Sequence, residues 1–174
     1  PAAVVAARHV PRAVLPLVGH DDLRQLLLAI AAHHRRPSLE RFGVVKILRN
    51  EMPSHRVYED EQTLAFMDIM PVSKGHTLVI PKTKGENIFD VDAESLSAVI
   101  KTTKRVAEAI KKALEPSGMI VTQLNGAKAG QTVFHYHMHI IPVYEKAPFQ
   151  PHANDLEDAE ILASTAETIK QTLL

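Results

Sequence analysis

Three histidines alternate with large apolar residues in the stretch 134–140, and this pattern constrains the fold of the chain more than any other. Successive side chains of a β-strand point to opposite faces, so His135, His137 and His139 are expected to share one face of a strand. The residues expected to be buried on the other face are Phe134, Tyr136, Met138 and Ile140. The sequence therefore predicts a strand that carries a row of imidazoles.

Three interpretations of this row compete. The histidines of a half-buried strand could simply face water. They could bind zinc, but at about 3.3 Å per residue His135 and His139 would lie about 13 Å apart, so all three cannot easily converge on one ion. The third interpretation is nucleophilic catalysis, because a neutral imidazole with a pKa of about 6.5 offers an unprotonated ring nitrogen at neutral pH. We favour it, since neighbouring histidines could orient the nucleophile or protonate a leaving group.

Composition excludes several other classes of protein. Twenty basic residues balance 20 acidic ones without a long basic run, so nothing indicates binding to a nucleic-acid backbone. The absence of cysteine excludes disulfides and thiolate chemistry, and it favours an intracellular setting. No apolar run reaches the roughly 20 residues that span a bilayer, so we expect a soluble, cytoplasmic protein. An organelle is the alternative location, because residues 1–20 contain arginines and no acid.

Periodicity divides the chain into three parts. Residues 1–39 read as an N-terminal extension that contains an amphipathic helix over 21–34, and 40–147 read as one catalytic domain. Residues 148–174 read as a tail with a helix from Asn154, where Asn154 and Glu157 are spaced as a capping box. Within the domain we expect a short helix over 44–50, strands over 56–60, 63–69, 76–81 and 119–124, and a long helix over 92–114 whose buried face includes Ile100.

A glycine-containing loop, 125–132, ends three residues before the first histidine of the row. Gly126 and Gly130 would let the backbone approach an anion and point its N–H groups at phosphate oxygens. The loop is not a Walker motif, because the spacing is one residue short and Gln131 stands in place of the lysine. An ordinary hairpin turn is the alternative to a phosphate cradle.

The row of histidines fits the signature His-φ-His-φ-His-φ-φ, where φ is apolar, and characteristic blocks precede it in order. These blocks are Met52–Ser54, Val57–Asp60, Ala65–Ile69, Pro71–Lys82 and Ala129–Gln131. In these motifs, residues from about 43 to 142 resemble the histidine triad family of nucleotide hydrolases and transferases. The resemblance implies an α+β fold in which an antiparallel sheet of about five strands packs with one long helix, and a homodimer. The helical tail is more similar to bacterial and fungal members of the nucleoside phosphoramidase branch.

The resemblance also implies catalytic roles. His137 would attack the α-phosphorus of a nucleotide and form a covalent nucleotidyl-imidazole that water then hydrolyses. His135 would orient it, and His139 would bond the phosphate or the leaving group. His76 matches a fourth histidine beside the triad, although it could instead be a strand-end histidine in water.

The implied nucleotide contacts are spread over the chain. Asp68 would hold the ribose hydroxyls, since two acceptor oxygens suit a vicinal diol. Apolar walls of a base pocket would come from Ile47, Phe66 and Ile69, although each could equally be plain core. The residues that match the phosphate-contacting loop are Asn125, Gly130, Gln131 and Thr132. Fixed donors there would stabilise charge in the transition state without a metal.

Two departures from the family pattern carry expectations. Many members bind structural zinc, but the corresponding positions here hold Phe42, Val45 and Lys84 beside His135, so we expect no metal and no cofactor. Val143 stands where relatives often have arginine, which would alter substrate preference.

The expected function is hydrolysis of a purine nucleotide at the α-phosphate, which releases a nucleoside monophosphate such as AMP from a phosphoramidate or adenylate conjugate. A dinucleoside polyphosphate hydrolase is the alternative enzyme. A nucleotide-binding interaction protein with incidental hydrolysis is the alternative of another class. The expected partners are a purine nucleotide and a second copy of the chain, without nucleic acid or membrane.

Overall fold

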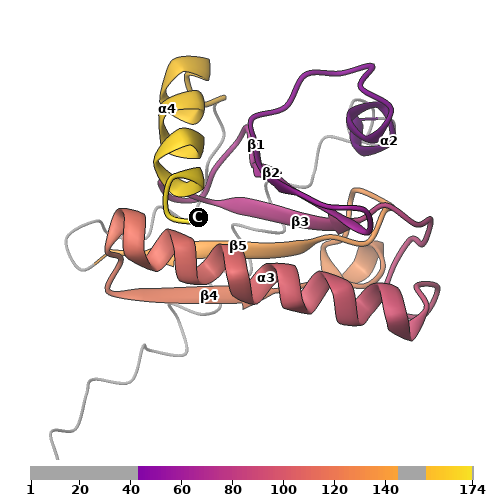
Figure 1. Cartoon of the computed structure of the whole chain (residues 1–174). Helices are drawn as coiled ribbons and strands as arrows, with labels where there is room; N and C mark the ends of the chain where they lie inside the picture. The colour runs from indigo at the N-terminus through magenta and orange to yellow at the C-terminus, as the bar shows by residue number, and fades with distance from the viewer. Residues whose placement is uncertain (1–42, 145–155, 174) are drawn as a thin grey trace, which may run out of the picture.

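A five-stranded antiparallel sheet with helices packed on it forms the structure, which confirms the predicted α+β class (Figure 1). The computed structural model describes residues 43–144 and 156–173. The strands lie in the order β1-β2-β3-β5-β4. The elements are α2 (Gly43–Leu48), β1 (Arg56–Glu59), β2 (Thr63–Met67), β3 (Thr77–Pro81), α3 (Ala93–Leu114), β4 (Gly118–Thr122), the 3-10 turn η1 (Ala127–Ala129), β5 (Met138–Val143) and α4 (Ala159–Lys170).

Strand β5 is central to the site because it lies between β3 and β4. His139 is opposite Leu78 of β3 and Thr122 of β4. The predicted strand over 134–140 is wrong in its first half, since β5 begins only at Met138. Before that point the N–H of Tyr136 donates to the carbonyl of Gly85 in the loop after β3, at 2.8 Å. This loop contact replaces the strand ladder, so His135 and His137 precede the strand.

Helix α3 runs along the sheet and buries one face against it (Figure 1). Its first turn is capped by Asp92, whose carboxylate accepts from the N–H of Ser95. Val99, Val106 and Ile110 are fully buried in the main core. Ile100, which was expected on the same face, is 52% exposed. It follows Val99 directly, and one residue rotates a helical side chain by about 100°.

The tail helix α4 packs against α3 and β1 through Leu162, Ala166 and Ile169. Its cap is Asp158, whose carboxylate accepts from the N–H of Glu160 at 2.7 Å. The expected cap Asn154 lies outside the described residues, as do the helix predicted over 21–34 and the rest of the extension. Among the described residues, no helix is both long and apolar enough to cross a membrane.

Candidate active site

Four buried histidines come together where β3, β5 and the irregular segment before β5 meet. His76 precedes β3, His139 lies in β5, and His135 and His137 lie in the segment 133–137. All four rings are at most 6% exposed. Histidines that merely faced water would not be buried, so that interpretation of the row is wrong.

The ring of His137 is held by the main chain two residues earlier. Its Nδ1 lies 2.7 Å from the carbonyl oxygen of His135. A carbonyl can only accept, so Nδ1 carries the proton and, in the neutral ring, Nε2 carries the lone pair. Burial lowers the pKa of His137, and its bond to His135 and the charge of Asp68 oppose that shift only in part. The ring is therefore neutral at neutral pH, with its lone pair on Nε2.

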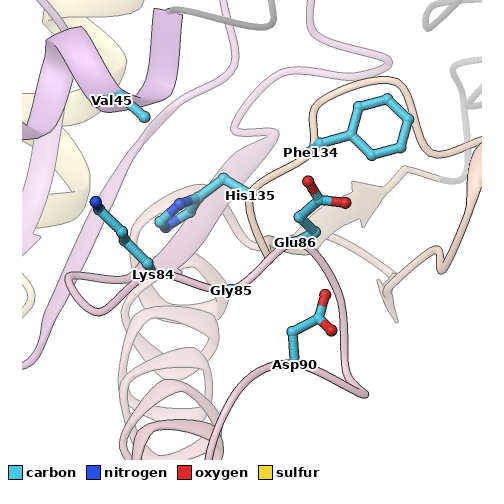
Figure 2. Close-up of a pocket in the computed structure, with 7 residues that line it drawn as sticks. All are labelled: Val45, Lys84, Gly85, Glu86, Asp90, Phe134 and His135. Atoms are coloured by element: carbon cyan, nitrogen blue, oxygen red, sulfur yellow. The ribbon is translucent and has the colours of Figure 1, made fainter.

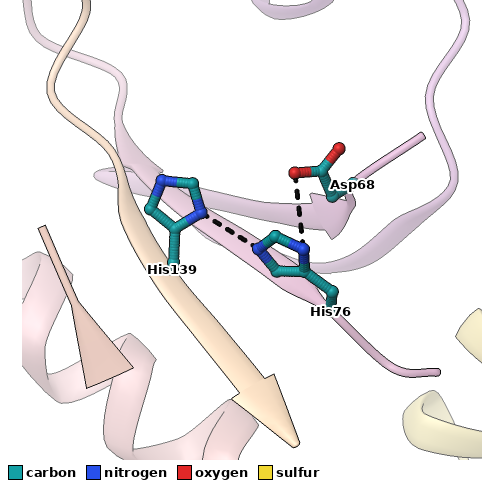
Figure 3. Close-up of side chains that lie close together, drawn as sticks. All are labelled: Asp68, His76 and His139. Atoms are coloured by element: carbon teal, nitrogen blue, oxygen red, sulfur yellow. Dashed lines mark hydrogen bonds and ion pairs between the residues drawn. The ribbon is translucent and has the colours of Figure 1, made fainter. Parts of the chain in front are cut away.

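His139 lies beside His137 and is linked to His76. The rings of His137 and His139 are 5.0 Å apart between centroids and meet edge to face. Nδ1 of His139 lies 3.0 Å from Nε2 of His76 (Figure 3). The predicted place of His76 in the histidine network is therefore observed, and its alternative as a solvent-facing strand end is wrong because His76 is 1% exposed.

Asp68 closes this group from the end of β2. One carboxylate oxygen accepts from the N–H of Met70 at 2.9 Å, and the other lies 3.6 Å from Nδ1 of His76 (Figure 3). Asp68, His76 and His139 each offer a ligand atom within 4.8 Å of the other two. Both ring nitrogens of His76 already have hydrogen-bond partners, namely the N–H of Val72 and His139. Hydrogen bonding therefore accounts for the grouping without a metal ion.

The ring of His135 lies in a separate cavity of about 550 Å³ (Figure 2). Its Nε2 donates to the carbonyl of Pro81 at 2.9 Å, and burial lowers its pKa. The main chain of His135 holds the ring of His137, while the ring of His135 lies in this cavity, so the expectation that all three histidines share one strand face is wrong. The cavity is lined by Val45, Lys84, Gly85, Glu86, Asp90, Phe134 and His135.

Two of the positions that the family resemblance implies as zinc ligands in many members line this cavity. Val45 and Lys84 lie beside His135, so the fold does bring these positions together (Figure 2). An isopropyl group cannot ligate zinc, and an ammonium group has no lone pair to offer. The residues present do not fit the metal; Phe42, at the other position, lies outside the described residues.

The glycine-containing loop is shaped by its own polar side chains. Gly126 and Gly130 have backbone φ angles of 86° and 97°, which residues with a side chain rarely adopt. The Gln131 side chain is 1% exposed; its oxygen accepts from the N–H of Gly126, and its NH₂ group donates to the carbonyls of Glu86 and Val133. Asn125 likewise accepts from the N–H of Ile88 at 2.9 Å.

These contacts change the expected roles in the loop. The Gln131 side chain uses both its oxygen and its NH₂ group on neighbouring backbone groups, and the Asn125 oxygen is used on Ile88, so both side chains hold the loop in place. Gly130 and Thr132 are partly exposed. The N–H groups of Gly126 and Gly130, which were expected to point at phosphate oxygens, donate inside the loop instead, to the Gln131 side chain and to the carbonyl of Ala127. Thr132, at the end of the loop, keeps its predicted position near the histidine segment.

The expected base-pocket residues differ in exposure. Ile47 and Phe66 lie in a small core cluster with Val44, Leu64 and Ile80. Ile69 is 54% exposed directly after Asp68. Of the three, Ile69 therefore has the most surface to offer a ligand, and Ile47 and Phe66 contribute mainly to the core.

Several groups that organise the site belong to the backbone. The carbonyls of Pro81 and His135 and the N–H of Val72 each hold a histidine ring. Sequence reasoning did not assign them, because every residue type except proline carries the same main-chain donor and acceptor. Only the tertiary fold selects which of them meets a ring.

Comparisons with known proteins agree with this geometry. Residues 49–146 match the HIT domain family. Protein hit of Bacillus subtilis is 46% identical over 127 residues, which cover 69% of this chain and 88% of the relative. Adenylylsulfatase HINT3 of Arabidopsis thaliana is 37% identical over 58% of this chain and 51% of its own length. The crystal structure of a Hit-like protein of Bartonella henselae superposes with a TM-score of 0.69 at 46% identity, covering 74% and 94% of the two chains.

Proposed function

Because this chain belongs to the histidine triad (HIT) domain family, we propose that it hydrolyses purine nucleotides at the α-phosphate through a covalent intermediate on His137. The family match and the similarity to an adenylylsulfatase support a nucleotide hydrolase in general. The observation that carries the finer proposal is the bond from Nδ1 of His137 to the carbonyl of His135. It leaves the lone pair on Nε2, where a nucleophile needs it.

The proposed reaction has two displacements at phosphorus. Nε2 of His137 bonds to the α-phosphorus while the bond to the leaving group breaks, and His139 gives the leaving group a proton. The nucleotidyl-imidazolium that results keeps its proton on Nδ1, bonded to the carbonyl of His135. Water then attacks phosphorus and gives a proton to His139, which restores the proton that His139 lost in the first displacement. The P–N bond breaks, and His137 returns to its neutral form as nucleoside monophosphate leaves.

The charge that develops on the phosphoryl oxygens needs fixed donors. The loop 125–132, with Thr132 at its end, lies next to the histidine segment in the chain, and the N–H groups of Gly126, Gly130 and Gln131 donate inside the loop. Gln131 and Asn125 hold that loop through their side chains, so Thr132 is carried by a fixed backbone and a donor there would need little reorganisation during the reaction. We assign Thr132 the contact to phosphate, and we assign Gly130, whose N–H donates to the carbonyl of Ala127, together with Gln131 and Asn125, the support of the loop.

The remaining nucleotide contacts follow from the expected family roles. Asp68 is proposed to bind the ribose hydroxyls, and Ile69 to face the base with Ile47 and Phe66 behind it. Adenylate conjugates, including phosphoramidates, are the proposed substrates, because an adenylylsulfatase is among the relatives. The proposed catalytic domain is 40–147, with the extension before it and the tail after it.

A homodimer is proposed from the exposed edge of the sheet. Strand β4 is the last strand and is only partly buried, and Val121 on it is 45% exposed. Ile100 on α3 adds a second exposed apolar side chain. Pairing of two β4 strands would cover an edge that is otherwise open to association.

The test is release of AMP from three substrates: an adenosine phosphoramidate, adenylyl sulfate and a diadenosine polyphosphate. We expect turnover of the first two by wild type and none by His137→Ala. Faster cleavage of the diadenosine compound would favour the alternative hydrolase. Binding of AMP with no turnover of any substrate would replace the enzyme with a nucleotide-binding protein.

A further inference from the structure

We propose that the backbone N–H of Val72 sets the tautomer of His139, acting through His76. This makes His76 and the turn before β3 positioning elements for the proton donor of the site. The tautomer assignment stands on hydrogen-bond geometry alone, and only its catalytic consequence rests on the proposed function.

The first link joins Val72 to His76. The N–H of Val72 donates to Nδ1 of His76 at 3.2 Å. Nδ1 can accept only through its lone pair, so the ring is neutral and this nitrogen is unprotonated. The nearest oxygen of Asp68 lies 3.6 Å from the same nitrogen, too far for an N–H···O hydrogen bond, so the shorter contact at Nδ1 is the one with the amide of Val72.

The second link joins His76 to His139 (Figure 3). A neutral ring without a proton on Nδ1 carries it on Nε2, and Nε2 of His76 lies 3.0 Å from Nδ1 of His139. His76 is therefore the donor in this bond, and Nδ1 of His139 is the acceptor. The proton of a neutral His139 must then sit on its Nε2.

The link works only if the turn is rigid, and the surrounding contacts fix it. The N–H of His76 donates to the carbonyl of Ser73 at 3.1 Å, and its carbonyl accepts from the N–H of Asp68 at 3.0 Å. Val72 is buried against Ile141 of β5, and the hydroxyl of Ser73 donates to the carbonyl of Pro142. The donor and the ring that receives it are thus both held to β5, the strand that carries His139.

The result is a pair of adjacent histidines in opposite tautomers. A carbonyl keeps the proton of His137 on Nδ1, whereas an amide N–H keeps the proton of His139 on Nε2 through one intermediate ring. One ring therefore offers a nucleophilic Nε2 and its neighbour an Nε2–H donor, although both are histidines on the same short segment. Without the Val72 link, His139 could take either tautomer, and in one of them its Nε2 could not protonate a leaving group.

The first experiment is ¹⁵N NMR of the imidazole nitrogens in the wild-type chain with assigned histidines, which reports each tautomer directly. We expect the Nε2–H form for His76 and His139 and the Nδ1–H form for His137. An Nδ1–H form of His139, or of His76, would overturn the proposal. Expected tautomers without turnover of any adenylate substrate would refute the proposed function and leave the tautomer assignment standing.

The second experiment compares Val72→Pro, which removes the N–H, with Val72→Ala, which keeps it and removes only side-chain packing. In Val72→Pro we expect a mixed population of His139 tautomers and about tenfold or more slower cleavage of a substrate with a poor leaving group than in Val72→Ala. The two variants should differ less with a good leaving group. Equal tautomers and equal rates in the two variants would overturn the proposal.

Discussion

The histidine triad divides into two regions that follow different structural rules. His139 lies within β5, where pairing with β3 and β4 fixes its backbone. His135 and His137 lie in the irregular segment before it, where Tyr136 bonds to the loop carbonyl of Gly85. Away from the ladder, the carbonyl of His135 can turn to the ring of His137 at 2.7 Å. The break in the strand therefore creates the contact that leaves the lone pair of His137 on Nε2.

The comparison predicts that the irregular segment 133–137, which carries His137, contributes more to catalysis than β5, which carries His139. For His137→Ala we expect a loss of kcat on the order of 10⁴-fold or more with adenosine phosphoramidate, because no group remains to form the covalent bond. Release of AMP, followed by chromatography, measures it. His55→Ala is the matched control, since it removes a histidine outside this group and should keep wild-type activity.

Substitution of His139 in β5 should affect the rate in a different way. For His139→Ala we expect a loss of kcat of about 10²- to 10³-fold with a poor leaving group and a much smaller loss with a good one. Comparing alkylamine and arylamine phosphoramidates measures this difference. An equal loss with both leaving groups would contradict the role of His139 as the proton donor.

The support of the loop 125–132 can be removed without changing a histidine. Gln131→Leu leaves Gly126, Glu86 and Val133 without their side-chain partner, and we expect a loss of about 1–3 kcal/mol in the free energy of unfolding. Gln123→Leu is the control, because the Gln123 amide donates to the carbonyl of Leu124, its own neighbour. Urea unfolding of both variants measures the difference; equal stability would remove the supporting role of Gln131.

The sequence predicted the fold class and most of the elements, because apolar periodicity and turn residues report local structure directly. The strands over 56–60, 63–69, 76–81 and 119–124 and the helix over 92–114 were confirmed within a few residues. The row at 135–139 was predicted as continuous strand because apolar residues and histidines alternate with the two-residue period of a strand. The alternation is the same whether or not the backbone pairs with a neighbouring strand, so it could not show that β5 begins only at Met138. The roles of Gln131 and of the Val72 N–H depend on tertiary contacts that no local pattern encodes.

Acid should lower the folding stability of the protein through protonation of the two buried histidines in the irregular segment 133–137. Burial lowers the pKa of His135 and His137 in the folded chain below the unfolded value of about 6.5. The unfolded chain therefore binds more protons as pH falls, and the stability that these rings contribute above about pH 6.5 is lost below it. Urea unfolding at pH 7.5 and pH 5.5 should show a smaller decrease for His137→Ala than for wild type. An equal decrease would contradict the shift.

The most direct measurement of the central claim is the intact mass of the protein after brief incubation with an adenosine phosphoramidate and a quench that avoids acid. Wild type should gain the mass of one adenylate, and digestion should place it on His137. His137→Ala and His137→Gly should show neither adduct nor AMP. An adduct that persists in these variants, or one located on another residue, would contradict the assignment of His137 as the nucleophile.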